Sequence, residues 1–273
     1  MNSKSEISII IPAHNEEKRI QKCLKRTIEY CTQKQYNFEI IVTEDGSTDN
    51  TIDVIKDFQQ KCDKIKLISF KERLGKGGAI AQAMFTATKK NVGFMDADLA
   101  TDPSEFEKLL DEIVNNDVVI GSRIIRGTLP PIKRPFYRTV FSHLYSKFFR
   151  MLFRIQIFDP QCGFKLFRRE VIPKLFNEVH TTGFAFDSEI IVRACSSDLK
   201  IKEIPINWDH QAASKIRVIT QIKEMGSDLL SIWYEFHLLW LQNKKVYPQK
   251  RASLKGRILF RFLSLYKKSK GRN

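Results

Sequence analysis

The sequence predicts an α/β fold, with a mostly parallel sheet covered by helices on both faces. Two observations predict it. Short runs rich in β-branched residues alternate with longer polar stretches of helical periodicity through the first half of the chain. The short runs are almost continuously apolar, as strands buried on both faces are. With 273 residues, of which 42% are hydrophobic, the chain can bury a sizeable core, and bulk disorder is excluded.

The expected elements follow one another regularly up to the middle of the chain. Strands are expected at 7–11, 38–43, 65–69, 92–95 and 118–121. Helices are expected at 16–33, 51–61, 78–89 and 103–115. The second half differs, because basic amphipathic helices are expected at 137–155, 216–241 and 254–263. We therefore expect one domain over 1–240, with halves at 1–122 and 123–240, and a basic amphipathic tail at 241–273.

The formal net charge of +15 is concentrated in two segments. Segment 126–169 holds ten Lys or Arg and one acid, and segment 244–273 holds eleven Lys or Arg and no acid. Such clusters favour anionic partners, namely lipid headgroups, nucleic acid or phosphorylated substrates.

The cysteines and the apolar runs indicate a setting for the protein. Five cysteines without a C-x-x-C pair argue against a disulfide framework or a zinc ribbon and favour a reducing compartment. No apolar run reaches the roughly 18–20 residues of a membrane-spanning helix. The first strand begins within a few residues of the N-terminus, which leaves no room for a signal peptide. We expect a protein of the cytoplasmic side.

Polar clusters follow three of the expected strands, at 12–16, 44–49 and 96–102. Because ligands of open parallel sheets gather outside the carboxyl ends of the strands, three clusters in register indicate a site. In the third cluster, Asp96 and Asp98 can converge on one divalent cation and the diphosphate that it binds, since Mg²⁺ and Mn²⁺ prefer hard oxygen ligands. A solvated turn is the alternative.

The other clusters each allow a structural and a ligand-binding interpretation. In segment 44–49, Ser47 or Asp49 can cap the helix that starts at Thr51, or a carboxylate can accept from a nucleobase or ribose. Segment 12–16 is equally ambiguous. The glycine-rich segment 75–79 opens a helix and can hold an anion or form a flexible turn, but it does not match a phosphate-binding P-loop. Histidine pairs at zinc-site spacing, the dinucleotide fingerprint and the hydrolase elbow are all absent from the sequence.

Taken in order, these segments resemble the family 2 inverting glycosyltransferases, over about residues 5–240. The segments that carry the resemblance are Pro-Ala-His-Asn-Glu (12–16), Glu-Asp-Gly-Ser-Thr-Asp (44–49), Gly-Lys-Gly-Gly-Ala (75–79), Asp-Ala-Asp-Leu-Ala-Thr (96–101), Gly-Ser-Arg (121–123), Asp-Pro-Gln-Cys-Gly-Phe-Lys-Leu-Phe (159–167), Phe-Ala-Phe-Asp-Ser-Glu (184–189), and Trp208 followed by Ser214-Lys215. The later segments are similar to the branch that charges polyprenyl phosphates, in particular with glucose.

The resemblance implies a nucleotide-binding fold of the glycosyltransferase A type, a nucleotide-sugar donor and a Mg²⁺ or Mn²⁺ cofactor. It implies a donor-binding half at 1–122 and an acceptor-binding half at 123–240. Positions carried over to the nucleoside pocket are Pro12, Asn15, Glu16 and Asp45. Positions carried over to the metal and the donor phosphates are Asp96, Asp98, Lys76 and Lys215. Positions carried over to the acceptor phosphate are Arg123, Arg138 and Ser142.

Departures from the pattern bear on the sugar. The mannose-transferring branch commonly has a metal-binding Gln where Ala100 stands and an Arg where Asp209 stands. Ala100-Thr101 resembles the glucose branch instead. Two features depart from that branch, which usually has Gly where Ala213 stands and often begins with a membrane anchor that is not expected here. UDP-glucose is therefore the expected donor, and GDP-mannose is the alternative.

The expected acceptor is dolichyl or another polyprenyl phosphate, which needs no general base. The second pKa of a phosphate monoester is about 6, so the acceptor is already an anion at neutral pH. Arg123 and Arg138 would orient it, while a metal at Asp96 and Asp98 would neutralise the leaving group. Direct attack would invert the anomeric carbon and give a β-linked product from an α-linked donor.

Because the acceptor tail stays in the bilayer, the basic helices are expected to contact an anionic membrane surface from its cytoplasmic face. The alternative is that 137–155 packs on the sheet and the tail is a solvated arm. A transferase that extends a glycan with Asp187 or Glu189 as base is a rival function. A third possibility, a non-catalytic module that binds membrane or nucleic acid, is disfavoured by the intact Asp-x-Asp pair, and we expect no nucleic-acid partner.

Overall fold

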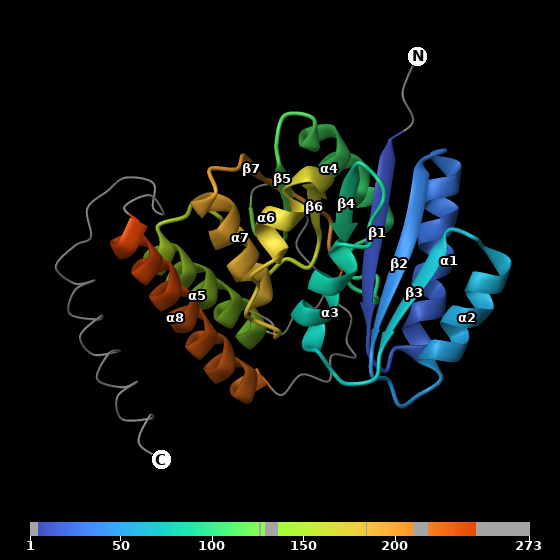
Figure 1. Ribbon diagram of the computed structural model, residues 1–273, viewed down its shortest axis with the longest axis horizontal. Helices are drawn as coiled ribbons and strands as arrows, with labels where there is room; N and C mark the ends of the chain where they lie inside the picture. Colours follow the sequence, from blue (N-terminus) through green and yellow to red (C-terminus); the bar gives the residue numbers. More distant parts are fainter. Residues whose placement is uncertain (1–4, 126, 129–135, 184, 210–217, 244–273) are drawn as a thin grey trace.

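A computed structural model of the chain shows an α/β domain with one central sheet (Figure 1). The structure describes residues 5–243, except 126, 129–135, 184 and 210–217. Side chains at the start of α5 and at both ends of α8 also lie outside the described residues. The expected tail at 244–273, with its amphipathic stretch at 254–263, falls outside them as well.

The sheet has seven strands in the order β3-β2-β1-β4-β6-β5-β7. All neighbouring strands are parallel except that β6 runs antiparallel to both β4 and β5. The order reverses at β1, which lies between β2 and β4, so the switch point that favours ligand binding lies at the carboxyl ends of β1 and β4. The strands are β1 (Glu6–Ala13), β2 (Asn37–Asp45), β3 (Ile65–Phe70), β4 (Asn91–Phe94), β5 (Val118–Ser122), β6 (Lys165–Arg168) and β7 (Ile201–Pro205).

Helices cover both faces of the sheet, as the apolar strands require. In β1, Ile7, Ile9 and Ile11 face a core that α1, α2 and α4 complete, while Ile10 faces a core built with α3, α5, α6, α7 and α8. The helices are α1 (Glu17–Gln33), α2 (Thr51–Lys61), α3 (Gly75–Met84), η1 (Pro103–Glu105), α4 (Phe106–Ile113), α5 (Phe136–Phe153), η2 (Arg169–Val171), α6 (Ile172–Phe176), α7 (Phe186–Ser196) and α8 (Val218–Asn243).

The five strands expected from the sequence are confirmed to within two residues at each end, and the α/β fold class is confirmed. One helix was misplaced, because α3 begins at the glycines, at Gly75, and ends at Met84 rather than spanning 78–89. Strands β6 and β7 were not expected. Each is only four or five residues long, and β6 carries Lys165 in its buried pattern, so neither shows the long apolar run on which strand prediction rests.

The second half adds a helical layer beside the sheet. Helices α5 and α8 contact each other and lie side by side, away from β1, β2 and β3 (Figure 1). Helix α5 buries Phe149 and Phe153, whereas Leu144 and Met151 on its other side are 56% and 67% exposed. Within the described residues, no helix combines the length and the apolar character needed to cross a membrane.

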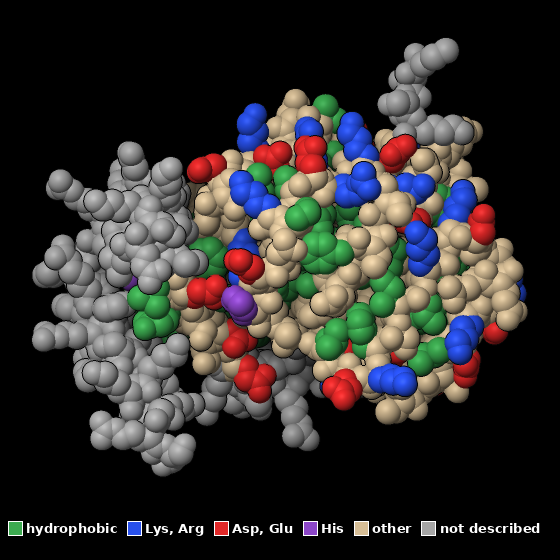
Figure 2. Space-filling model, viewed as in Figure 1, with side chains coloured by type: hydrophobic (Ala, Val, Ile, Leu, Met, Phe, Trp, Pro, Cys, Tyr) green, Lys and Arg blue, Asp and Glu red, His purple; other side chains and the backbone are tan. Residues whose placement is uncertain are grey.

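The basic character of segment 126–169 is only partly a surface property. Lys165 is fully buried, and the guanidinium of Arg168 donates to the carbonyls of Ile113, Val114 and Asn116. On the face shown in Figure 2, Lys and Arg side chains are interspersed with Asp and Glu rather than gathered in one patch. Lys165 therefore does not contribute to a surface that could attract anionic partners.

Candidate active site

The turns after β1 and β2 are joined by side-chain hydrogen bonds. The backbone N–H of Asn15 donates to Ser47 Oγ at 3.0 Å, and the N–H of Thr48 donates to Asn15 Oδ1 at 2.8 Å. Nδ1 of His14 lies 2.7 Å from the carbonyl oxygen of Asp45. Asn15 adopts a left-handed backbone conformation with φ of 55°, which Asn tolerates better than most residues. These contacts fix the relative positions of the two turns at the carboxyl ends of β1 and β2.

Residues expected in the nucleoside pocket also have roles in holding these turns. Glu16 forms an ion pair with Arg19 at 2.5 Å, and its N–H donates to Thr51 Oγ1. Pro12 is half-buried near the end of β1. Asp49 accepts from the N–H of Thr51 at 3.0 Å and so satisfies a donor at the start of α2, but Asn50, and neither Ser47 nor Asp49, occupies the cap position.

Asp45 fixes the start of α3. Its carboxylate accepts from the N–H of Leu74 at 2.6 Å and from the N–H of Gly75 at 3.0 Å, and the residue is only 4% exposed. Because both carboxylate oxygens accept backbone donors, Asp45 positions the glycine-rich segment. The family resemblance implies a nucleoside contact for Asp45, whereas its contact with the start of α3 was not expected.

The glycines of α3 allow a close approach of the chain that precedes α7. Gly75 has a φ of +78°, and a Cβ on it would lie 2.6 Å from the carbonyl oxygen of Thr182. A Cβ on Gly77 would lie 2.5 Å from Cβ of Phe186, and the N–H of Gly77 donates to Thr182 at 2.8 Å. Segment 75–79 is thus the closely packed start of a helix, which argues against the alternative of a flexible turn.

Asp96 and Asp98 follow β4 at the switch point. The ammonium of Lys76 lies 2.6 Å from Asp96 Oδ1, and Asp98 Oδ1 accepts from the N–H of Ala100 at 2.9 Å. Burial, and then repulsion from Asp96, raises the pKa of Asp98 above its ordinary value. Burial opposes the charge of Lys76, but the Asp96 carboxylate outweighs it, so the pKa of Lys76 is raised. The carboxylates of Asp96 and Asp98 therefore converge here, and the ammonium of Lys76 reaches Asp96 from α3.

The donor set and its surroundings fit a divalent cation. A Cβ on Gly163 would lie 2.4 Å from Asp96 Oδ2, so the absence of a side chain at 163 leaves the space in which that carboxylate sits. Within the described ranges, no three His, Cys, Asp or Glu side chains gather closely enough to hold a metal. A Mg²⁺ or Mn²⁺ ion at Asp96 and Asp98 would therefore take its other ligands from water and from substrate phosphates, which is common for Mg²⁺.

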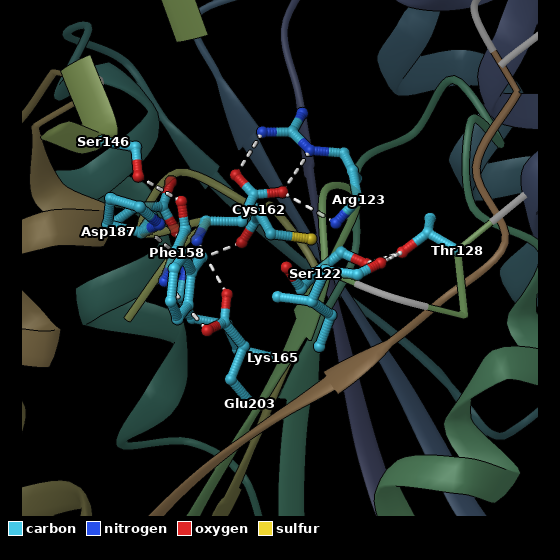
Figure 3. A network of polar contacts seen from close by, with 12 residues as sticks. Ser122, Arg123, Thr128, Ser146, Phe158, Cys162, Lys165, Asp187 and Glu203 are labelled. Atoms are coloured by element: carbon cyan, nitrogen blue, oxygen red, sulfur yellow. Dashed lines mark hydrogen bonds and ion pairs between the residues drawn. The ribbon is translucent and has the colours of Figure 1, made fainter. Parts of the chain in front are cut away.

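Arg123 lies beside this pair and is held by Asp159. The guanidinium donates through Nε and Nη2 to the two oxygens of Asp159, both at 2.8 Å, and the backbone N–H of Arg123 donates as well (Figure 3). Burial opposes this charge, but Asp159 raises the pKa of Arg123, and Arg123 in turn lowers the pKa of the buried Asp159. Such a fork is geometrically rigid, so the direction of the guanidinium is fixed.

The loop at 158–163 carries Asp159 and Gly163, and the side chains of Glu203 and Lys165 hold its backbone in place. Glu203 accepts from the N–H groups of Phe158 and Asp159 at 2.8 and 2.7 Å. The buried ammonium of Lys165 donates to the carbonyls of Pro160 and Cys162 and to the carboxylate of Asp187 (Figure 3). Burial raises the pKa of the Cys162 thiol to about 12, which makes it an unreactive packing group.

Asp187 and Glu189, the candidate bases of the rival function, are both buried and paired. Asp187 binds Lys165, and Glu189 accepts from the N–H groups of His180 and Thr181 and from the guanidinium of Arg193 at 2.8 Å. Glu189 is 1% exposed. Neither carboxylate is placed to take a proton from an acceptor at the surface, so the geometry disfavours the rival.

The residues expected at the acceptor phosphate, and Lys215 expected at the donor phosphates, are described only in part. Ser142 is half-buried on α5, one turn before Ser146, whose hydroxyl donates to the carbonyl of Phe158. The side chain of Arg138 and the whole of Lys215 lie outside the described residues.

Trp208 places its ring 5.6 Å from the guanidinium carbon of Arg123, and the N–H of Asp209 donates to the carbonyl of Ala100 at 2.7 Å. One small cavity is lined by both halves of the chain, through Asp96, Asp98, Ala100, Thr101, Arg123, Cys162, Gly163 and Trp208.

Sequence reasoning missed the residues that support the site from within. Lys165, Glu203 and Thr182 act through the loop and the helix start that they hold. Lys165 left a signal, because it stands alone among Phe164, Leu166 and Phe167, and a charge in a short apolar run is rarely buried without a partner. Thr182 left none, since its contact is made by backbone atoms.

Comparisons with known proteins agree with this geometry. The family model described as Glycosyl transferase family 2 matches residues 8–176. The dolichyl-phosphate beta-glucosyltransferase of Drosophila melanogaster is 34% identical over 246 residues, which cover 85% of this chain and 75% of that protein. The dolichyl-phosphate beta-glucosyltransferase of Saccharomyces cerevisiae is 34% identical over 88% of this chain and 78% of its own.

Among solved structures, the chain resembles glucosyl-3-phosphoglycerate synthase from Mycobacterium tuberculosis, crystallised with Mn²⁺, uridine-diphosphate-glucose and phosphoglyceric acid. The TM-score is 0.64 at 18% identity, with 84% of this chain and 80% of that chain covered. This likeness supports the glycosyltransferase A-type fold. By its family match and by relatives that cover most of its length, the chain belongs to glycosyltransferase family 2 and is an enzyme of that family.

Proposed function

We propose that this enzyme transfers glucose from UDP-glucose to dolichyl or another polyprenyl phosphate, with inversion at the anomeric carbon. The observation that carries the proposal is the cavity lined by Asp96, Asp98 and Arg123. Two carboxylates suited to a metal ion and a fixed guanidinium would then lie on either side of the reacting groups. Relatives named dolichyl-phosphate beta-glucosyltransferase, at about a third identity, support the choice of sugar and acceptor.

The donor side is proposed from the residues at the switch point. A divalent cation at Asp96 and Asp98, Mg²⁺ or Mn²⁺, would neutralise charge on the diphosphate leaving group. Lys76 lies at this edge and would contact the donor phosphates, as would Lys215. The nucleoside would lie against the interlocked turns, near Pro12, Asn15, Glu16 and Asp45, although Asp45 would have to share its carboxylate with the start of α3.

On the acceptor side, the phosphate monoester is the nucleophile. One of its oxygens forms a bond to the anomeric carbon, the bond from that carbon to the UDP oxygen breaks, and UDP leaves with the electron pair. The phosphate arrives already ionised, so no protein carboxylate has to remove a proton. Arg123 would bind and orient this phosphate together with Arg138 and Ser142. The two hydrogen bonds from Arg123 to Asp159 would hold the guanidinium in place.

The exposed side of α5 supports contact with a membrane surface. Val140, Phe141, Leu144 and Met151 are between 36% and 67% exposed, and basic residues of the same helix flank them. The polyprenyl tail stays in the bilayer, so an enzyme that binds the phosphate would lie at an anionic membrane surface. We propose no nucleic-acid partner. All five cysteines are free thiols, which fits the cytoplasmic face.

The direct test uses purified enzyme, dolichyl phosphate and either radiolabelled UDP-glucose or GDP-mannose, with Mn²⁺, Mg²⁺ or EDTA. Label from UDP-glucose should enter the organic phase only when a divalent cation is present. Asp98→Asn should lower kcat by roughly 10²–10³, whereas Asp53→Asn, an exposed position on α2, should not. Transfer of mannose alone would support the GDP-mannose alternative, and transfer to soluble glycans but not to lipid phosphate would contradict the proposal.

A further inference from the structure

Lys76 occupies part of the site in which the metal and the donor phosphates are proposed to bind. Its ammonium lies 2.6 Å from Asp96 Oδ1, and the lysine side chain is 23% exposed while that of Asp96 is 44% exposed. Asp96 and Asp98 are the only carboxylates that the Asp-x-Asp motif offers to a cation. An ammonium in contact with one of them therefore halves the local negative charge available to a metal ion.

The backbone that carries Lys76 is fixed, whereas its side chain can turn. Asp45 holds the N–H groups of Leu74 and Gly75, and Thr182 holds the N–H of Gly77. Four rotatable carbon–carbon bonds nevertheless let a lysine ammonium exchange one nearby anion for another. Asp187 is a second carboxylate close enough to raise the pKa of Lys76, but it is already bound to the buried ammonium of Lys165. A nucleoside diphosphate at the site would offer Lys76 a better partner.

We propose that Lys76 acts as an internal counter-cation, which neutralises Asp96 in the absence of nucleotide and moves to the diphosphate when the nucleotide binds. The inference rests on the proposed function, since it takes Asp96 and Asp98 as the place of the metal–diphosphate pair. In the absence of nucleotide, Lys76 competes with a divalent cation for Asp96. With nucleotide present, the added negative charge removes that competition, so the enzyme takes up the cation and the nucleotide together.

The test measures Mn²⁺ binding by electron paramagnetic resonance, with and without UDP, in the wild type and in Lys76→Met. Loss of one partly exposed ion pair should tighten binding of Mn²⁺ alone by roughly fivefold. The same substitution should weaken UDP binding in the absence of metal, and UDP should enhance Mn²⁺ binding less than in the wild type. Lys76→Arg keeps the charge and should bind Mn²⁺ like the wild type.

Matched controls separate this role from a general change of charge. Lys66→Met removes an ammonium on β3 that lies 2.7 Å from Glu39 on β2, near the amino ends of these strands, and it should leave Mn²⁺ affinity unchanged. Asp98→Asn should weaken Mn²⁺ binding in both the wild-type and the Lys76→Met backgrounds, and circular dichroism verifies that each variant is folded.

An unchanged or weaker Mn²⁺ affinity in folded Lys76→Met would overturn the inference. This result is distinguishable from failure of the proposed function, because Mn²⁺ binding is measured without lipid acceptor. If the wild type transfers glucose to dolichyl phosphate while Lys76→Met binds Mn²⁺ no more tightly, the role of Lys76 alone is wrong. If the wild type transfers no glucose, the proposed function is wrong whatever Mn²⁺ does.

Discussion

The two halves of the molecule stabilise their buried carboxylates in different ways. In the first half, carboxylates accept mainly from backbone N–H groups and hydroxyls. Glu44, which is fully buried, binds the hydroxyl of Ser69 at 2.7 Å and the N–H of Ser47, and Asp45 binds two N–H groups at the start of α3. Apart from Ser69, which lies on β3, these donors come from turns and helix starts that the carboxylates themselves hold in place.

In the second half, each buried carboxylate is paired with a cation that is itself largely buried. Asp159 binds Arg123, and Asp187 binds Lys165, whose side chain is 0% exposed. Glu189 binds Arg193, which is 9% exposed. Loss of one partner there leaves an uncompensated charge in the interior, which is far less favourable than the loss of one neutral hydrogen bond. The second half should therefore be the more sensitive to substitution of a single charge.

The largest expected effect is in Lys165→Met. The substitution leaves Asp187 buried without its cation and frees the carbonyls of Pro160 and Cys162, so the free energy of unfolding should fall by about 3–5 kcal/mol. Urea unfolding followed by circular dichroism measures it. The double variant Lys165→Met/Asp187→Leu should recover much of the loss, because the stranded charge is removed. A fall below about 1 kcal/mol in the single variant would contradict the comparison.

Arg123→Lys should have the next largest effect, and the chain offers a matched control. Arg26 makes the same two-pronged contact with Asp102 through Nε and Nη2, but their side chains are 40% and 44% exposed. We expect Arg123→Lys to reduce the free energy of unfolding by about 2–3 kcal/mol and Arg26→Lys by less than about 1 kcal/mol. Equal losses in chemical denaturation would show that burial does not separate the two pairs.

Gly163→Ala tests the contact between the two halves at Asp96. A Cβ would meet the Asp96 carboxylate at 2.4 Å, so this carboxylate should turn away and Mn²⁺ should bind roughly tenfold more weakly in the presence of UDP. Gly183→Ala is the control, because no heavy atom lies within 4 Å of its added Cβ. Unchanged Mn²⁺ affinity in a folded Gly163→Ala protein would mean that Asp96 does not need this space.

Glu39→Gln should have the smallest effect and a characteristic pH dependence. Burial alone would raise the pKa of Glu39, but hydrogen bonds from Lys66, Ser8 and Thr88 lower it from an ordinary 4.5 to about 2. The charged form is therefore favoured by folding, and its contribution is present above about pH 4.5 and lost as the pH falls toward 2. We expect a loss of about 1 kcal/mol at pH 7, since Lys66 is half exposed.

The pH series itself provides the control for Glu39. The difference in unfolding free energy between the wild type and Glu39→Gln should shrink as the pH is lowered below the ordinary pKa of a glutamate. A difference that stays constant down to pH 2, or grows, would show that the negative charge of Glu39 does not contribute to the stability of the folded protein.

What could be predicted from the sequence follows the same division. The first half is made of local strand–turn–helix units, so apolar runs and turn residues placed five strands and the clusters at Asn15, Asp45 and Asp98 correctly at one edge of the sheet. In the second half the contacts join distant segments, such as Arg123 to Asp159. Neither periodicity nor spacing encodes such pairs. The resemblance to a family indicated that these segments matter, but it did not indicate which side chains meet.

The central claim is that an ionised lipid phosphate, steered by Arg123, displaces the nucleotide without a protein base. The most direct measurement compares glucose transfer from UDP-glucose to dolichyl phosphate and to dolichol, which differ only in the phosphate, at saturating Mn²⁺. The account predicts product with dolichyl phosphate alone, with kcat/KM for this acceptor falling as the pH is lowered through the second phosphate pKa of about 6. Comparable transfer to the uncharged alcohol would contradict it.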